Sequence, residues 1–232
     1  MRKCVIDIET VACEDPGLAL APFIKNLHGK TSKPKAGSGL RGIVDSESKA
    51  DVALDKAALS PVASRLLCIG MYTEVEDESP LFAGKSEFVL IYDKDEKKML
   101  EQFKAHIMNI PTLITFNGRS FDFPFLMFRA AVHRIPLSLD IYPYNGKAGH
   151  IDLFVHLNAV GLLGNLDQSL RMVGLKKWIE YFGLGTKQSI ANGDLNLLEM
   201  DKAGDTEGIL NYTKNDVMKT YELFKIFEGN FR

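Results

Sequence analysis

The sequence predicts an α/β fold in which helices flank a mixed central β-sheet. Strand-like apolar runs come mainly early in the 232-residue chain, and helical patterns lie between and after them. A hydrophobic content of 46% is enough for a substantial core. We therefore expect a single domain over residues 1–232, with a loop and helical insertion around 11–60.

The first strand is expected at residues 4–10, where Val5, Ile6 and Ile8 are β-branched. Within the insertion, short helices are expected at 18–27 and 49–59. Between them, 29–42 is rich in glycine and basic residues, which predicts a loop. Both a solvated surface loop and a flap that contacts the substrate fit this composition.

The rest of the chain alternates between strand-like and helix-like hydrophobic patterns. Strands are expected at 65–73, 80–84, 112–116 and 150–153. The apolar run 88–92 fits either type of element. Helices are expected at 93–108, 121–133, 154–163, 166–173 and 206–227, with irregular segments at 136–149 and 183–194.

Composition excludes several classes of protein. With 28 basic and 30 acidic residues the net charge is −2, so the chain as a whole is not a basic nucleic-acid binder, although a local basic patch is compatible with it. Three cysteines without C-x-x-C spacing argue against a disulfide framework or a zinc site, and favour a reducing compartment, the cytoplasm. The N-terminus does not resemble a signal peptide, and no run approaches the roughly 18 apolar residues of a membrane span.

Asp7 and Glu9 form the most informative pair in the sequence. Their two-residue spacing places both carboxylates on one face of the first strand. Two acids on an apolar strand repel each other, and burial increases this cost unless a cation lies between them. The pair therefore indicates a hard metal ion such as Mg²⁺ or Mn²⁺.

Further acids occupy positions that suit the same site. Asp122 follows the strand 112–116, where α/β sheets place ligands, and Asp152 follows His150 in another predicted strand. Tyr212 and Asp216 lie four residues apart, on one face of the last helix. Taken singly, each also fits an ordinary role: a helix cap, a solvated carboxylate or a core aromatic.

Together these residues resemble the motifs of the DnaQ-like 3′–5′ exonucleases of the ribonuclease H-like fold. The nearest group is the one related to the proofreading domain of family B DNA polymerases. Residues 5–10 resemble its first motif, D-x-E after an apolar strand, and 116–124 resemble its second, N-x(2–3)-F-D-x-P. Residues 212–216 resemble its third motif in the Y-x-x-x-D form of the DEDDy subclass. The resemblance extends from residue 3 to about 225 and is least in the segment 11–60.

The resemblance implies a metal-dependent 3′–5′ exonuclease that acts through two divalent ions, Mg²⁺ or Mn²⁺. Such ions, about 4 Å apart, stabilise the attacking and the leaving oxygen of a phosphodiester. It implies that Asp7 bridges both ions and that Glu9 and Asp216 complete the site that binds the nucleophilic water. Asp122 would help to hold the second ion. Tyr212 would orient the water, since a phenol with a pKa near 10 is a poor base at neutral pH.

The substrate contacts follow from the same resemblance. Phe121 is placed to stack on the terminal base, Asn117 to bond the terminal nucleotide and Lys187 to contact phosphate. Phe121 fits core packing equally well, and Asn117 fits a turn residue. Asp152 is expected to support the site or the fold without binding the metal.

The expected substrate is nucleic acid with single-stranded 3′ ends, single-stranded DNA being favoured over RNA. The motifs do not distinguish the two, because discrimination depends on contacts to the 2′-hydroxyl. A catalytically silent nucleic-acid-binding module on the same fold is the alternative, and the intact acid set argues against it. A nucleotide-binding enzyme is a third reading, but the G-x-G-x-x-G of residues 37–42 follows no convincing strand. The sequence carries no sign of oligomeric state.

Overall fold

The structure is a computed structural model that describes residues 2–13, 59–75, 86–139, 149–159, 173–185 and 197–231. The chain divides into two compact units, one formed by 1–9 with 68–232 and the other by 10–67. Within the second unit, Ala12 packs on Ala63, and the Cys13 N–H donates to the Ala63 carbonyl at 2.9 Å. The helices named below all belong to the first unit.

A five-stranded sheet with the strand order β3-β2-β1-β4-β5 forms the centre of the fold. Its strands are β1 (Arg2–Ala12), β2 (Ser64–Val75), β3 (Glu87–Ile91), β4 (Thr112–Thr115) and β5 (His150–Asp152). β1 pairs with β4 in parallel, as does β4 with β5, whereas β2 and β3 are antiparallel. The predicted mixed sheet is therefore confirmed.

The parallel part of the sheet brings three strand ends to one edge. Val5 is level with Ile114, and Ile114 is level with Ile151. The residues that follow along these strands include Asp7 and Asp152. They therefore lie at the carboxyl edge of the parallel part of the sheet. This edge is where α/β sheets place ligands.

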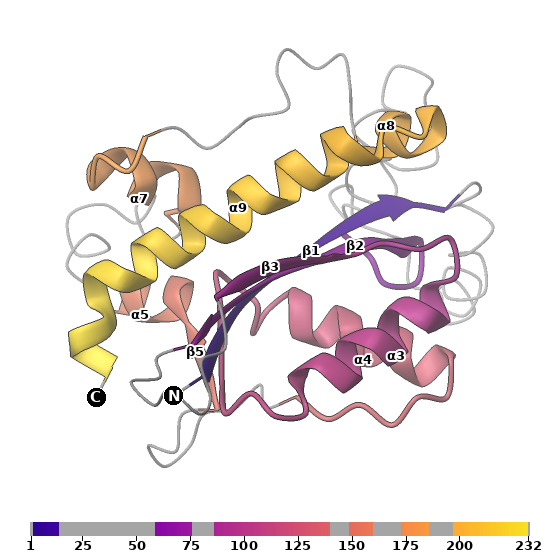
Figure 1. Ribbon diagram of the computed structural model, residues 1–232, viewed down its shortest axis with the longest axis horizontal. Helices are drawn as coiled ribbons and strands as arrows, with labels where there is room; N and C mark the ends of the chain where they lie inside the picture. Colours follow the sequence, from indigo (N-terminus) through magenta and orange to yellow (C-terminus); the bar gives the residue numbers. More distant parts are fainter. Residues whose placement is uncertain are drawn as a thin grey trace, which may run out of the picture. The chain divides into compact units, whose positions relative to one another are not determined.

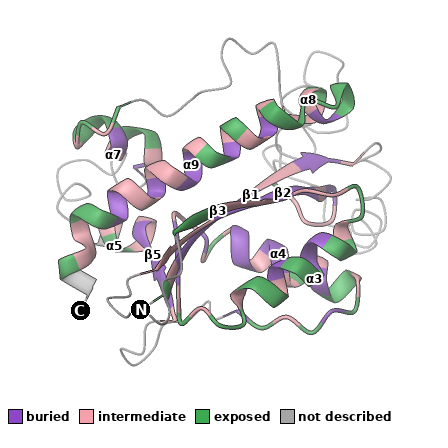
Figure 2. Cartoon of the chain, in the orientation of Figure 1, coloured by how far each residue is buried: buried purple, intermediate pink, exposed green. Residues whose placement is uncertain are grey.

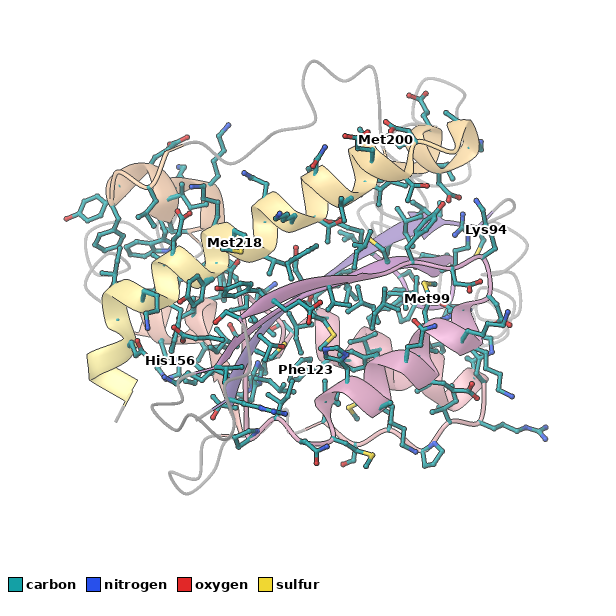
Figure 3. The ribbon with its side chains drawn as sticks, viewed as in Figure 1. Lys94, Met99, Phe123, His156, Met200 and Met218 are labelled. Atoms are coloured by element: carbon teal, nitrogen blue, oxygen red, sulfur yellow. The ribbon has the colours of Figure 1, made fainter. Side chains whose placement is uncertain are left out.

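Helices cover both faces of the sheet (Figure 1). They are α3 (Glu96–Ile107), α4 (Asp122–Val132), α5 (Leu153–Ala159), α7 (Leu175–Tyr181), α8 (Leu197–Ala203) and α9 (Thr206–Phe227), followed by a 3₁₀ turn (Glu228–Phe231). α3 and α4 lie on one face, and α9 crosses the other. The labelled side chains Phe123 on α4 and Met218 on α9 mark these two layers (Figure 3).

Helix α9 packs on the sheet through one apolar stripe. Buried and exposed segments alternate along its length (Figure 2). Val217 and Phe224 of this stripe join Val5, Ile114 and Ile151 of the sheet in one core cluster. Because the stripe repeats every three to four residues, it orients the whole helix about its axis.

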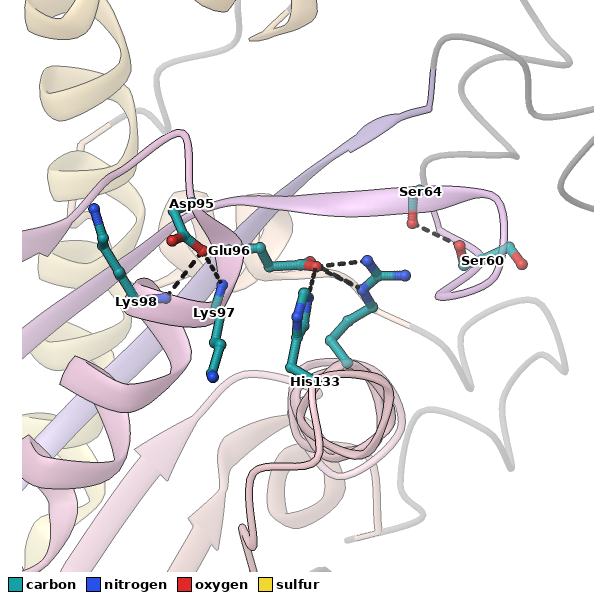
Figure 4. Close-up of polar contacts among 8 residues, drawn as sticks. Ser60, Ser64, Asp95, Glu96, Lys97, Lys98 and His133 are labelled. Atoms are coloured by element: carbon teal, nitrogen blue, oxygen red, sulfur yellow. Dashed lines mark hydrogen bonds and ion pairs between the residues drawn. The ribbon is translucent and has the colours of Figure 1, made fainter.

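Polar contacts fix the ends of several helices. Asp95 caps α3 by accepting the Lys97 N–H at 3.0 Å. Glu96 binds Arg129 of α4 and His133, the residue that follows this helix (Figure 4). At the other end of the unit, Glu228 bonds Lys3 of β1 and Lys225 of α9. These bonds hold α3 to α4, and the C-terminal turn to β1.

Most predicted elements are confirmed to within a few residues, and α9 matches the expected bounds 206–227. The ambiguous run 88–92 proves to be strand β3, since it pairs along β2. Helices α7 and α8 were not predicted. Several expected elements lie outside the described residues: those at 18–27 and 80–84, the loop 29–42, all but the last residue of 49–59 and all but the last residue of 166–173. Within the described parts of the chain, every helix is too short or too polar to span a bilayer.

Candidate active site

Three carboxylates from the two ends of the sequence converge at the carboxyl edge of β1. One oxygen from each of Asp7, Glu9 and Asp216 lies within 4.8 Å of the other two. Asp7 and Glu9 share the face of β1 that carries Val5, which packs beneath α9. The strand therefore presents both acids to the helix that carries Asp216.

Helix α9 supplies a tyrosine and a carboxylate at i, i+4 spacing. Asp216 is only 2% exposed, and Tyr212 lies one helical turn before it. Burial, then the charges of Glu9 and Asp216, raise the pKa of Tyr212 above its ordinary value of 10. The phenol is therefore neutral at physiological pH.

Asp122 approaches the site from the other layer of the fold. It begins α4, is 3% exposed, and its Oδ1 accepts the Ile8 N–H at 3.1 Å. This bond ties the carboxylate to β1 at the residue between Asp7 and Glu9. Burial, and then the charge of Asp7, raise the pKa of Asp122 well above its ordinary value.

Asp152 organises the turn that leads to Asp122. Its two carboxylate oxygens accept the Asn117 N–H at 2.9 Å and the Arg119 N–H at 2.8 Å. It also accepts the Phe154 N–H at 3.0 Å at the start of α5. With its acceptors engaged by backbone N–H groups, this carboxylate positions the chain between β4 and α4.

Two of the three residues expected to contact substrate lie on the turn before α4. Asn117 adopts a φ of 70°, the left-handed conformation that asparagine tolerates at turns. Phe121 is half-buried, and its ring lies 5.8 Å from that of Phe125. Both residues precede Asp122 on the turn that Asp152 holds. Lys187 lies outside the described residues.

The donor set suits a hard divalent cation. Asp7, Glu9 and Asp216 offer carboxylate oxygens at close range, as Mg²⁺ and Mn²⁺ prefer. The nearby Cys68 thiol contacts the Thr213 hydroxyl at 3.3 Å, and burial followed by the charge of Glu9 raises the pKa of this thiol. A thiol held neutral in this way is a poor metal ligand, so the site offers oxygen rather than sulfur. A cation would also relieve the repulsion among the acids.

The structure adds two contributors that the sequence did not indicate. The Ile8 N–H is a backbone donor, which no residue pattern reveals. Thr213 donates its hydroxyl to the Ile209 carbonyl at 2.9 Å and meets Cys68 beneath the site. A small polar residue in the apolar stripe of α9 was the available signal for this second contact.

Comparison with known proteins places this geometry in a family. Residues 88–231 match the predicted 3′–5′ exonucleases related to the exonuclease domain of PolB. The chain is 28% identical over 156 residues to the DNA polymerase epsilon catalytic subunit of Emericella nidulans, an alignment that covers 62% of this chain and 7% of that protein. The same polymerase subunit from Dictyostelium discoideum is 27% identical over 146 residues, with coverages of 59% and 6%. The chain thus spans a small part of the length of these relatives.

A solved structure supports the same assignment of the fold. The family B DNA polymerase from the hyperthermophilic archaeon Pyrobaculum calidifontis superposes with a TM-score of 0.57 at 16% identity, over 98% of this chain and 24% of that one. The ribonuclease H-like fold and the resemblance to family B polymerase exonucleases are therefore confirmed. The family match begins after β1, so the position of Asp7 and Glu9 beside Asp216 comes from the structure.

Proposed function

This chain belongs to the predicted 3′–5′ exonucleases related to the exonuclease domain of PolB, and we propose that it removes nucleotides from single-stranded 3′ ends with two divalent metal ions. The observation that carries the proposal is the convergence of Asp7, Glu9 and Asp216 within 4.8 Å. An inactive relative would have no need to keep three mutually repelling acids together.

The four carboxylates are proposed to bind different ions. Asp7, Glu9 and Asp216 would hold the ion that binds the nucleophilic water, and Asp7 with Asp122 would hold the second. Bound divalent ions supply charge neutralisation at both the attacking and the leaving oxygen. Because one strand and two helices carry these carboxylates, the fold would hold both ion sites in place before substrate arrives.

Tyr212 acts by orientation rather than by proton abstraction. Its raised pKa keeps the phenol protonated beside the charges of Glu9 and Asp216. The oxygen of a neutral phenol has lone pairs that accept a hydrogen bond from the attacking water. The water is thereby aligned with the scissile phosphate.

Substrate contacts are proposed for two residues of the turn before α4 and for Lys187. Asn117 would bond the terminal nucleotide, Phe121 would stack on its base, and Lys187 would contact a phosphate. The contact between Phe121 and Phe125 would hold the stacking ring in place. We favour single-stranded DNA, with RNA as the competing substrate. The free thiols Cys4, Cys13 and Cys68 are compatible with our proposal that the protein works in the cytoplasm.

The test compares wild type with Asp7→Ala on 5′-labelled single-stranded DNA and RNA in Mg²⁺ or Mn²⁺. We expect stepwise shortening from the 3′ end, slowed by at least about 10²-fold in the variant. The variant should unfold at the same or a higher urea concentration without metal, because removing the Asp7 charge relieves repulsion around Asp122. Equal activity in both proteins would contradict the proposal. Binding without hydrolysis by wild type at millimolar Mn²⁺ would favour a silent binding module instead.

A further inference from the structure

Helix α9 packs on one face of β2. Cys68, Gly70 and Tyr72 are spaced by two residues and so share this face. Cys68 contacts Thr213, and the Tyr72 ring lies 4.7 Å from the Tyr221 ring. Gly70 lies between these two contacts, under the centre of the helix.

Gly70 allows an unusually close approach between strand and helix. A Cβ atom at this position would lie 2.5 Å from Thr213 Cγ2 and 2.9 Å from Val217 Cγ2. Real Cβ atoms essentially never come within 3.0 Å of a neighbour. The φ of Gly70 is not positive, so it is space, and not backbone conformation, that requires glycine here.

The two residues that meet Gly70 directly follow the two functional residues of α9. Thr213 follows Tyr212, and Val217 follows Asp216. Because the helix is rigid, Tyr212 and Asp216 move together with Thr213 and Val217. The depth at which Thr213 and Val217 sit on Gly70 therefore sets how close Asp216 comes to the acids of β1.

We propose that Gly70 is a positioning residue for the active site, which brings α9 close enough for Asp216 and Tyr212 to join Asp7 and Glu9. This inference rests on the proposed exonuclease function. Restoring an ordinary contact distance of 3.4 Å to Thr213 would require a retreat of about 0.9 Å. Displacements of that size at a catalytic centre cost up to about 10²-fold in rate.

The experiment uses Gly70→Ala, Thr213→Ser and the double variant. Serine lacks the Cγ2 methyl that the new Cβ would meet, and keeps the hydroxyl that bonds Ile209. Each protein is assayed for kcat and KM on single-stranded DNA, and for Mn²⁺ affinity by calorimetry, at a temperature where all are folded. Leu100→Val, in the buried face of α3, provides a destabilised control away from α9.

We expect Gly70→Ala to lower kcat about 10- to 10²-fold and to weaken Mn²⁺ binding, with KM little changed. Thr213→Ser should recover part of both losses in the double variant, while Leu100→Val leaves both values at the wild-type level. Unchanged Mn²⁺ affinity and kcat in Gly70→Ala, or losses that Thr213→Ser does not relieve, would overturn the inference. If wild type lacks nuclease activity, the proposed function fails, and the Mn²⁺ affinities of the same variants still decide the role of Gly70.

Discussion

Replacing Asp152 by asparagine should destabilise the fold far more than a change of one atom suggests. The amide retains one oxygen, which can still accept the Asn117 and Phe154 N–H groups. In the wild-type protein the Arg119 N–H bonds the carboxylate at 2.8 Å. In the variant the NH₂ group of asparagine faces this N–H instead. Two donors in contact leave a part-buried N–H unsatisfied, at a cost of about 1–3 kcal/mol. Loss of the charge weakens the remaining bonds, so we expect a total of about 2–4 kcal/mol.

The assay is urea unfolding followed by circular dichroism and by the fluorescence of Trp178, the chain's one tryptophan. Asp205→Asn is the matched control, because Asp205 caps α9 at an exposed position through one bond to the Gly208 N–H. Asparagine is an equally good cap, so this variant should stay within about 0.5 kcal/mol of wild type. If Asp152→Asn is no less stable than Asp205→Asn, the account of Asp152 as the acceptor that organises this turn is wrong.

Three further outcomes are expected. Tyr212→Phe should lower kcat about 10- to 100-fold while Mn²⁺ affinity by calorimetry stays at the wild-type value, because the phenol orients water and is not an expected ligand; loss of metal binding would contradict this role. Burial alone would raise the pKa of Glu228, but its two lysine partners lower it from 4.5 to about 2. Its stabilisation is then complete above about pH 4.5 and lost as pH falls through about 2. Glu228→Gln should therefore cost about 1–3 kcal/mol in urea melts at pH 7 and much less at pH 2; an equal cost at both pH values would refute the assignment. Glu96 and Arg129, with side chains 10% and 16% exposed, should show a coupling free energy of about 1–3 kcal/mol in a double-mutant cycle, with exonuclease activity unchanged in the single variants.

Hydrophobic periodicity was sufficient to predict the main elements of this fold. The 22-residue α9 has enough turns for its apolar stripe to stand out. Helices α7 and α8 have seven residues each, too few for a periodic pattern to separate helix from loop. The five-residue β3 was ambiguous for the same reason, and pairing along β2 decided its type.

The candidate site could be listed from the sequence but not assembled from it. Motif spacing named the acids, whereas the closeness of Asp7 to Asp216 depends on how α9 crosses the sheet. The acceptor role of Asp152 involves backbone N–H groups, which carry no sequence signal. Like Thr213, Gly70 was a local signal that the sequence predictions did not use, since an isolated glycine in an apolar strand often marks a close backbone approach.

The acid cluster joins the first strand of the chain to helix α9, and this has a consequence for when the cluster can form during folding. Asp7 and Asp216 can meet only after the long segment between them has been made and folded, so theirs is a contact of very long sequence separation. Contacts of this kind form late, after local helices and hairpins have reduced the entropy of closure. A ribosome-bound chain that has not yet released α9 would carry Asp7 and Glu9 without their third partner. The order of synthesis would thus leave the proposed metal site incomplete until its scaffold is in place.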